Sequence, residues 1–266
     1  MADTAYVSLR KGRYSLWVRQ TAVANSVEII APQPYEISGL TFTPDGNYLD
    51  YTLWEDVQAG RIYQIPVLGG PARRLTKNSF SDVTFSPDGR QMAFARIGNA
   101  GTEADLVIAN TNGEDEHTVL THKISFESWD GVFQLLRWSN DGENIVAAMV
   151  GASSDGQKTF LLLIDPRNGR EKQIAGLGWR SISDLDWLPD GSVRTSRTYE
   201  RTTGYFARTG RFPERKAGAC ILQSTDPKLG KEWMTIEAVR PDREHGWQHV
   251  DRAVEAGDCK KHSPRG

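Results

Sequence analysis

The sequence predicts an all-β protein, a β-propeller built from four-stranded antiparallel blades. A five-residue phrase ending in Asp-Gly occurs four times, and its aspartates lie 43, 53 and 49 residues apart. Repetition at about 40 to 50 residues is typical of propellers and other repeat arrays. Between the phrases, short apolar segments alternate with turn residues, four segments to a period, as in a propeller blade. The phrases occupy residues 42–46, 85–89, 138–142 and 187–191.

Each Asp-Gly pair is predicted to close the first hairpin of a blade. Aspartate accepts hydrogen bonds from its own downstream backbone, and glycine adopts positive φ without a Cβ clash. Metal binding by these aspartates is the alternative, but the turn explains the pairs without a metal, and their spacing puts them on four different blades. The structural turn residues are Asp45, Gly46, Asp88, Gly89, Asp141, Gly142, Asp190 and Gly191. No metal ligand or cofactor is predicted.

The first whole repeat shows the plan of a blade. Apolar and small residues alternate over 39–42, which suits a half-buried strand, and the Asp-Gly turn follows. The returning strand is followed by a polar loop, a third strand and the turn at 68–71, which contains Gly69-Gly70. The four strands of this repeat are expected at 39–42, 48–54, 61–67 and 72–76.

The second and third repeats follow the same plan. The third is longer because of its loops at 125–133 and 152–158, where insertions cost little stability. Strands are expected at 83–85, 91–96, 105–109 and 117–120, and then at 135–138, 144–149, 159–164 and 171–174. Aromatic residues on the strand faces are expected to pack in the core, among them Trp17, Tyr63, Phe94 and Trp138.

Both ends of the pattern are incomplete. Segments 15–19 and 26–30 match the third and fourth strands of a blade, so the chain is expected to enter mid-blade. A strand at 182–187 opens a fourth repeat, but the next segment carries charge where the other returning strands carry Ala, Val and Tyr. We therefore expect an incomplete propeller of three whole repeats and partial ones over 1–192. An irregular, arginine-rich tail over 193–266 follows, with disorder or a frameshift as the hypothesis.

Charge and hydropathy exclude several classes of protein. The chain has 32 Lys and Arg residues against 34 Asp and Glu residues, a net charge of −2. No overall field therefore recruits nucleic acid or an anionic membrane. No apolar run is long enough to span a bilayer, and the first residues lack the features of a secretory signal. The sequence thus predicts a cytoplasmic protein.

The sequence also lacks the motifs of the common enzymes that accompany propellers. There is no Gly-x-Ser-x-Gly elbow, and the kinase Gly-rich loop, His-Arg-Asp and Asp-Phe-Gly motifs are absent. His245 and His249 have the spacing of a helical metal pair, but the glutamate of such motifs is missing and Gly246 disfavours a helix. The sequence predicts a noncatalytic protein with no catalytic residue.

The Phe/Trp-Ser-Pro-Asp-Gly phrases resemble PD40 or TolB-like propeller repeats, which are related in geometry to WD40 repeats. The resemblance covers roughly residues 6–192. Segments 15–20, 39–48 and 63–70 further resemble the C-terminal propellers of bacterial serine/threonine protein kinases and winged-helix regulators of the acidobacterial type. In such proteins the propeller is the sensor or interaction part, attached to a separate catalytic or DNA-binding part. A membrane-anchored parent of this kind would place the propeller outside the cytoplasm.

The predicted function is that of an interaction or sensor module, which binds a protein or a small ligand through its blade loops. Phe126, Trp129 and Phe133 lie in or beside the largest inserted loop and are candidates for partner contact, because aromatic residues often dominate interfaces. Packing over the blade below is the alternative for these three side chains. No specific nucleic acid partner is expected.

A second hypothesis is that the chain is a fragment of a propeller-bearing kinase or regulator without independent activity. Its partner would then be the remaining blades of a larger protein. An incomplete propeller exposes sheet edges, which favour pairing with another chain.

Overall fold

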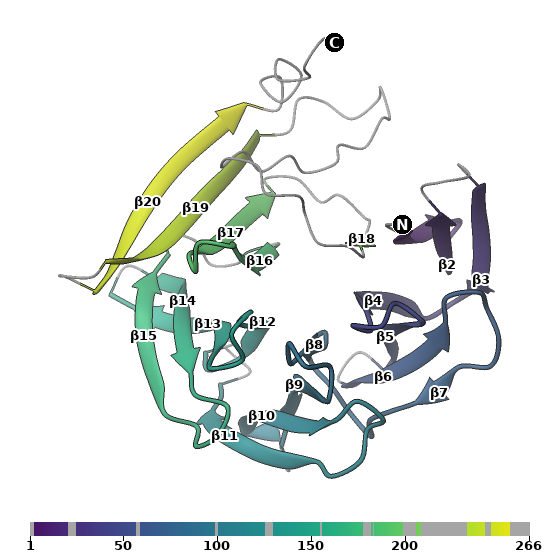
Figure 1. Ribbon diagram of the computed structural model, residues 1–266, viewed down its shortest axis with the longest axis horizontal. Helices are drawn as coiled ribbons and strands as arrows, with labels where there is room; N and C mark the ends of the chain where they lie inside the picture. Colours follow the sequence, from purple (N-terminus) through teal and green to yellow (C-terminus); the bar gives the residue numbers. More distant parts are fainter. Residues whose placement is uncertain are drawn as a thin grey trace.

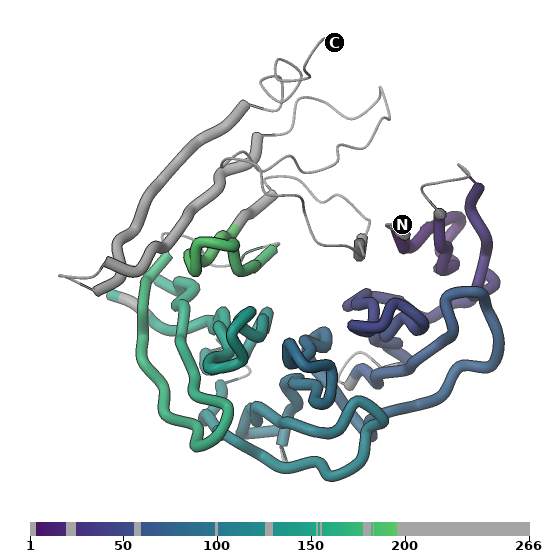
Figure 2. The backbone as a smooth tube through the Cα atoms, viewed as in Figure 1, coloured from purple at the N-terminus to yellow at the C-terminus, as the bar shows by residue number. Residues whose placement is uncertain are grey.

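The computed structural model describes residues 3–20, 25–56, 59–98, 101–125, 130–154, 156–177, 182, 184–198, 206–208, 233–242 and 246–255. The described elements are all strands, and they form five antiparallel sheets of four strands each. The sheets follow one another around a common centre, like the blades of a propeller (Figures 1 and 2). The predicted fold class is confirmed. Within the described part, no helix has the length and apolar character needed to cross a membrane.

Three blades consist of consecutive strands that run from the innermost to the outermost position (Figure 1). Their strands coincide with the three whole repeats predicted from the sequence. Blade 2 contains β4 (Glu36–Phe42), β5 (Tyr48–Asp56), β6 (Ala59–Pro66) and β7 (Arg73–Arg74). Blade 3 contains β8 (Thr84–Phe85), β9 (Gln91–Ile97), β10 (Glu103–Asn110) and β11 (His117–Lys123). Blade 4 contains β12 (Phe133–Trp138), β13 (Ile145–Ser153), β14 (Gly156–Ile164) and β15 (Glu171–Gly176).

Blade 1 combines strands from distant parts of the chain. β2 (Arg13–Gln20) and β3 (Asn25–Gln33) take the third and fourth positions, as predicted. The second position belongs to β1 (Asp3–Arg10), a strand that the sequence pattern did not indicate, and the innermost position to β18 (Phe206–Arg208). β1 buries Ala5 and Val7, whereas Thr4, Tyr6 and Ser8 are only partly buried, which is the alternation of a strand with one face on the core.

Blade 5 crosses the predicted boundary at residue 192. It contains β16 (Asp184–Trp187), β17 (Val193–Thr198), β19 (Trp233–Asp242) and β20 (Gly246–Glu255). β17 is the returning strand that the sequence pattern did not indicate. Arg194 pairs in register with Asp186 on one face of β17, and Val193 on the other face is fully buried. The stretch 193–266, expected to be irregular, therefore contributes strands to two blades.

The core lies between neighbouring blades rather than in one central mass. Blades 1 and 2 enclose one apolar cluster, and further clusters fill the interfaces of blades 2 with 3, 3 with 4 and 4 with 5. Of the aromatic residues expected in the core, Phe94 and Trp138 are buried and Tyr63 is partly buried. Trp17 is partly buried and stacks on Tyr6, with ring centroids 6.4 Å apart. Both faces of blades 2, 3 and 4 are thus covered.

The turn before each outermost strand rests on the preceding blade. Gly113 has a φ of 84°, and a Cβ there would lie only 2.5 Å from the carbonyl oxygen of Leu75 in blade 2. Gly169 likewise has positive φ, and a Cβ there would overlap the carbonyl oxygen of Val119 in blade 3. These turns need glycine both for the backbone conformation and for the close approach of the neighbouring blade.

Candidate functional site

The repeated Asp-Gly phrases form the same hydrogen-bonded turn in each blade that carries them. In blade 3 the Ser86 hydroxyl donates to Asp88 Oδ1 at 2.6 Å, and the Arg90 backbone N–H donates to the same oxygen at 3.1 Å. Thr43 and Ser139 donate to Asp45 and Asp141 in the same way, and Ser192 donates to Asp190. The glycines at 46, 89, 142 and 191 all have positive φ. In each phrase, at least one carboxylate oxygen of the aspartate therefore accepts hydrogen bonds within its own turn.

Removing one such carboxylate should cost a modest amount of stability. The hydroxyl of Ser139 and the backbone N–H of Glu143 both hold the pKa of Asp141 below its ordinary value. Asp141→Ala should lower the free energy of unfolding by about 0.5–1 kcal/mol at pH 7, because the carboxylate is exposed and water screens it. Urea unfolding measures this loss.

The same contribution depends on pH. Since the folded-state pKa of Asp141 is depressed, the stabilisation is present above the ordinary aspartate pKa of about 4 and is lost as the pH falls through the folded-state value. Asp141→Asn, which keeps an acceptor oxygen but cannot ionise, is the control and should lack this acid-dependent loss. Equal acid sensitivity in the wild type and in both variants would contradict the assignment.

Of the three aromatic residues predicted to contact a partner, the structure describes only Phe133. Phe126 and Trp129 lie outside the described residues. Phe133 is fully buried in the cluster between blades 3 and 4, and its ring meets that of His122 edge-on at 5.5 Å. A register shift between Phe133 and Leu135 at the start of β12 turns the Phe133 side chain into this core. Phe133 therefore packs in the core between two blades and is not exposed to a partner.

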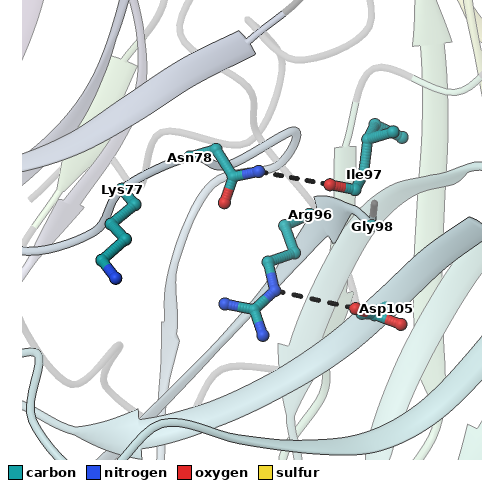
Figure 3. Close-up of a pocket in the computed structure, with 6 residues that line it drawn as sticks. All are labelled: Lys77, Asn78, Arg96, Ile97, Gly98 and Asp105. Atoms are coloured by element: carbon teal, nitrogen blue, oxygen red, sulfur yellow. Dashed lines mark hydrogen bonds and ion pairs between the residues drawn. The ribbon is translucent and has the colours of Figure 1, made fainter. Parts of the chain in front are cut away.

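A pocket of about 410 Å³ lies where the connection between blades 2 and 3 meets the ends of β9 and β10 (Figure 3). Lys77 and Asn78 come from the connection between β7 and β8, and Arg96 and Asp105 come from β9 and β10. The Asn78 side-chain amide donates to the carbonyl oxygen of Ile97 at 3.2 Å, which ties the two walls together. The lining residues are Lys77, Asn78, Arg96, Ile97, Gly98 and Asp105.

The charges in this pocket are held in fixed positions. Arg96 Nη1 lies 2.7 Å from Glu116 Oε2, and its Nε lies 3.7 Å from Asp105 Oδ2. The other oxygen of Asp105 accepts a hydrogen bond from Thr121 at 2.7 Å. Lys77 is exposed and has no ion-pair partner within the part of the chain that the structure describes. The pocket lining therefore combines an exposed lysine with an oriented guanidinium, and both groups can donate to an acceptor group of a ligand.

A second group of charges joins blades 3, 4 and 5. Asp82 precedes β8, and its Oδ2 lies 3.3 Å from Arg137 Nη1 on β12. On blade 5, Arg194 Nη2 lies 3.6 Å from Asp184 Oδ2 and 3.5 Å from Asp186 Oδ2. We call these five residues the inner charged cluster.

Burial and opposite charges shift the pKa values of two residues in the inner charged cluster, Arg137 and Asp186. Burial acts to lower the pKa of Arg137, but the carboxylates, with Asp82 the strongest, outweigh it and raise the pKa. Burial raises the pKa of Asp186, although Arg137 and Arg194 oppose this. Trp187 Nε1 also donates to the carbonyl oxygen of Arg137 at 3.1 Å. The cluster thus connects successive inner strands and has the features of a structural ion-pair network.

The sequence pattern indicated neither the pocket nor the inner charged cluster. Their residues are ordinary charged residues in connections and at strand ends, and only the ring of blades brings them together. Within the described residues, no group of three or more His, Cys, Asp and Glu side chains has a geometry that could hold a metal ion. His245 lies outside the described residues, and residues 246–255, which include His249, form a strand rather than a helix.

The fold resembles that of known propellers, whereas the sequence gives no match. No model of a known protein family matches the chain, and no curated protein sequence does. The crystal structure of TolB from Acinetobacter baumannii matches with 15% identity and a TM-score of 0.60, over 96% of this chain and 53% of that one. This chain therefore spans about half the length of that TolB.

Two further structures support the same fold. A putative TolB from Agrobacterium tumefaciens matches with 13% identity and a TM-score of 0.55, over 96% of this chain and 89% of that one. An oligogalacturonate lyase from Vibrio parahaemolyticus matches with 12% identity and a TM-score of 0.52, over 70% of this chain and 51% of that one. At such identities the similarity shows the fold alone, a TolB-like β-propeller.

Proposed function

We propose that this chain is a noncatalytic interaction module, a TolB-like propeller that binds a protein or a small ligand through the connections at one end of its blades. The observation that carries the proposal is the pocket at Lys77, Asn78 and Arg96, which lies where the connection between blades 2 and 3 meets the ends of β9 and β10. Connections vary freely while the strands hold the scaffold, so binding in propellers concentrates there.

The pocket is suited to binding rather than to reaction. Arg96 is oriented by two carboxylates before any ligand arrives, and such preorganisation favours affinity. Asp105, the carboxylate in the lining, already accepts from Thr121 and lies beside Arg96, so it is not placed as a general base. These contacts support recognition of a polar or anionic group.

The strand order defines which end of the blades would bind. In a four-stranded meander, the first and third turns lie at one end, and the second turn and the connection to the next blade lie at the other. The pocket lies at this second end, which we call the connection end. Phe126 and Trp129, which lie between β11 and β12 in the sequence, remain our candidates for contact with a protein partner there.

Paired variants at the two ends of the blades test the proposal. Phe126→Ser/Trp129→Ser and Lys77→Ala alter the connection end, while Leu68→Ser alters a residue that is 79% exposed in a turn at the opposite end. Quantitative affinity capture from the source cells should yield partners that bind the wild type and the Leu68→Ser variant equally. At least one connection-end variant should lose them, by about tenfold or more, as expected for a lost hot spot.

For a small ligand, the matched measurement is thermal stabilisation of the wild type and of the Lys77→Ala variant by carboxylate-bearing and phosphate-bearing compounds. A compound that raises the melting temperature of the wild type should do so much less for the variant. Retention of both protein and ligand binding in the connection-end variants, with loss in Leu68→Ser, would contradict the proposal.

The second candidate function is that of a sensor part within a larger kinase or winged-helix regulator. The resemblance of segments 15–20, 39–48 and 63–70 to such propellers supports it. The coding sequence next to this one tests the idea directly. A kinase or winged-helix domain in frame and upstream would support it, and unrelated genes on both sides would contradict it.

A further inference from the structure

An aspartate lies buried in the interface between blades 2 and 3. Asp50 on β5 is fully buried. Its neighbours Leu49 and Tyr51 point into the cluster shared with blade 1, so Asp50 points the other way. It pairs in register with Gln64 and shares a face with Ile62, which belongs to the cluster shared with blade 3. The carboxylate therefore faces the next blade and not solvent.

Asp50 is only half satisfied by hydrogen bonds. The Gln64 side-chain amide donates to Asp50 Oδ1 at 3.0 Å, and Arg73 Nη2 in turn donates to Gln64 Oε1 at 3.2 Å. Asp50 Oδ2 is buried and has no hydrogen-bond partner among the described residues. Burying an ionised carboxylate in this position costs free energy that its single hydrogen bond offsets only in part. A protonated carboxyl group is neutral, so its burial costs much less.

The surroundings of Asp50 offer little further charge. β4 places Thr41 opposite Asp50, but the Thr41 hydroxyl donates to the carbonyl oxygen of Val83. β6 supplies the neutral Gln64, and β7 supplies Arg73, the charged group that acts on Asp50. Blade 3 supplies the apolar side of the interface, with Val83, Met92, Phe94 and the partly buried Phe85. Arg73 thus acts on Asp50 through its charge, and its hydrogen bond goes to Gln64.

We propose that Asp50 is a pH-sensitive latch, which holds blade 2 against blade 3 when it is protonated and loosens that contact when it ionises. Burial raises the pKa of Asp50 to about 7, with Gln64 and Arg73 opposing the rise. The folded chain then binds a proton that the unfolded chain has already released at the ordinary aspartate pKa of about 4. Stability therefore falls as the pH rises between about 4 and 7, and the loss is complete above that range.

Native-state hydrogen exchange of amides in β5 and β9 tests the latch, with Asp50→Asn compared against the wild type from pH 5 to pH 8. Exchange rates are first corrected for the intrinsic pH dependence of amide exchange. Between pH 5 and pH 8, the equilibrium constant for local opening of these strands should then rise about a hundredfold more in the wild type than in the variant. The exposed Asp115, replaced by Asn, is the control and should keep the wild-type pH response. Parallel profiles for the wild type and Asp50→Asn would overturn the proposal.

A second pair of variants leaves Asp50 in place. Arg73 and Arg74 are both exposed, but Arg73 pairs with Gln64 whereas Arg74 pairs with Tyr63 on the opposite face of blade 2. Arg73→Met removes the charge that favours ionised Asp50, so it should move the pH midpoint of opening upward, while Arg74→Met should leave it unchanged. An unmoved midpoint in Arg73→Met, or an equal shift in both, would contradict the latch even if Asp50→Asn failed to fold.

Discussion

Replacing Phe133 by alanine is expected to lower the free energy of unfolding by about 3–5 kcal/mol. Phe133 is fully buried between blades 3 and 4, in the cluster that also contains Leu136 and Trp138. Truncation to alanine removes most of the ring and leaves a cavity that strands from two blades cannot close. Denaturant unfolding followed by tryptophan fluorescence measures the loss.

Two controls separate packing from partner contact at Phe133. Phe133→Leu retains most of the apolar volume and should cost about 1 kcal/mol. Leu68→Ala truncates a side chain that is 79% exposed and should change stability by less than about 0.5 kcal/mol. If Phe133→Ala left stability intact and weakened partner capture, the residue would be a contact residue after all.

Gly113→Ala is expected to destabilise the protein by about 3 kcal/mol. Positive φ costs a residue with a Cβ about 1–2 kcal/mol. The added Cβ would also press on the carbonyl oxygen of Leu75, 2.5 Å away, and force the turn of blade 3 off blade 2 at a further cost of about 1–3 kcal/mol. Thermal and urea unfolding both measure the sum.

Gly46→Ala separates these two costs. Gly46 has a φ of 72°, but no heavy atom lies within 4 Å of the position a Cβ would take. The free energy of unfolding of this variant should therefore fall only by the cost of placing a Cβ-bearing residue at positive φ, about 1–2 kcal/mol. Equal losses at Gly46 and Gly113 would mean that the blades do not meet closely at Leu75.

The repeat could be predicted from the sequence because turns and alternation are local signals. Aspartate before glycine marks each first hairpin, and apolar alternation marks the strands of blades 2, 3 and 4. β1 and β17 were missed for a local reason too. Neither strand shows the expected apolar run: β1 buries only the small or medium residues Ala5 and Val7, and in β17 the buried Val193 is followed by Arg194 and the buried Thr195.

The sites could not be predicted, because they depend on which blade lies beside which face. Alternation along β5 places Asp50 on the other face of the sheet from Leu49 and Tyr51. On an isolated sheet that face would be exposed to solvent, where an aspartate is expected. In a propeller that second face is covered by the next blade, so the same pattern buries the carboxylate. For Phe133 the sequence left partner contact and packing open, because the register shift that turns its side chain inward is not visible in the sequence.

The sheet that joins β18 to β1 has a consequence for biosynthesis. Tyr6 pairs with Phe206, so blade 1 is completed only after blades 2, 3 and 4, which lie between its strands in the sequence, have been synthesised. Until residues 206–208 emerge, β1 presents an open inner edge while the sequences of blades 2, 3 and 4 are already available for folding. An unpaired edge of this kind is a template for pairing with other chains. Slow or interrupted translation before residue 206 should therefore favour aggregation of the nascent protein.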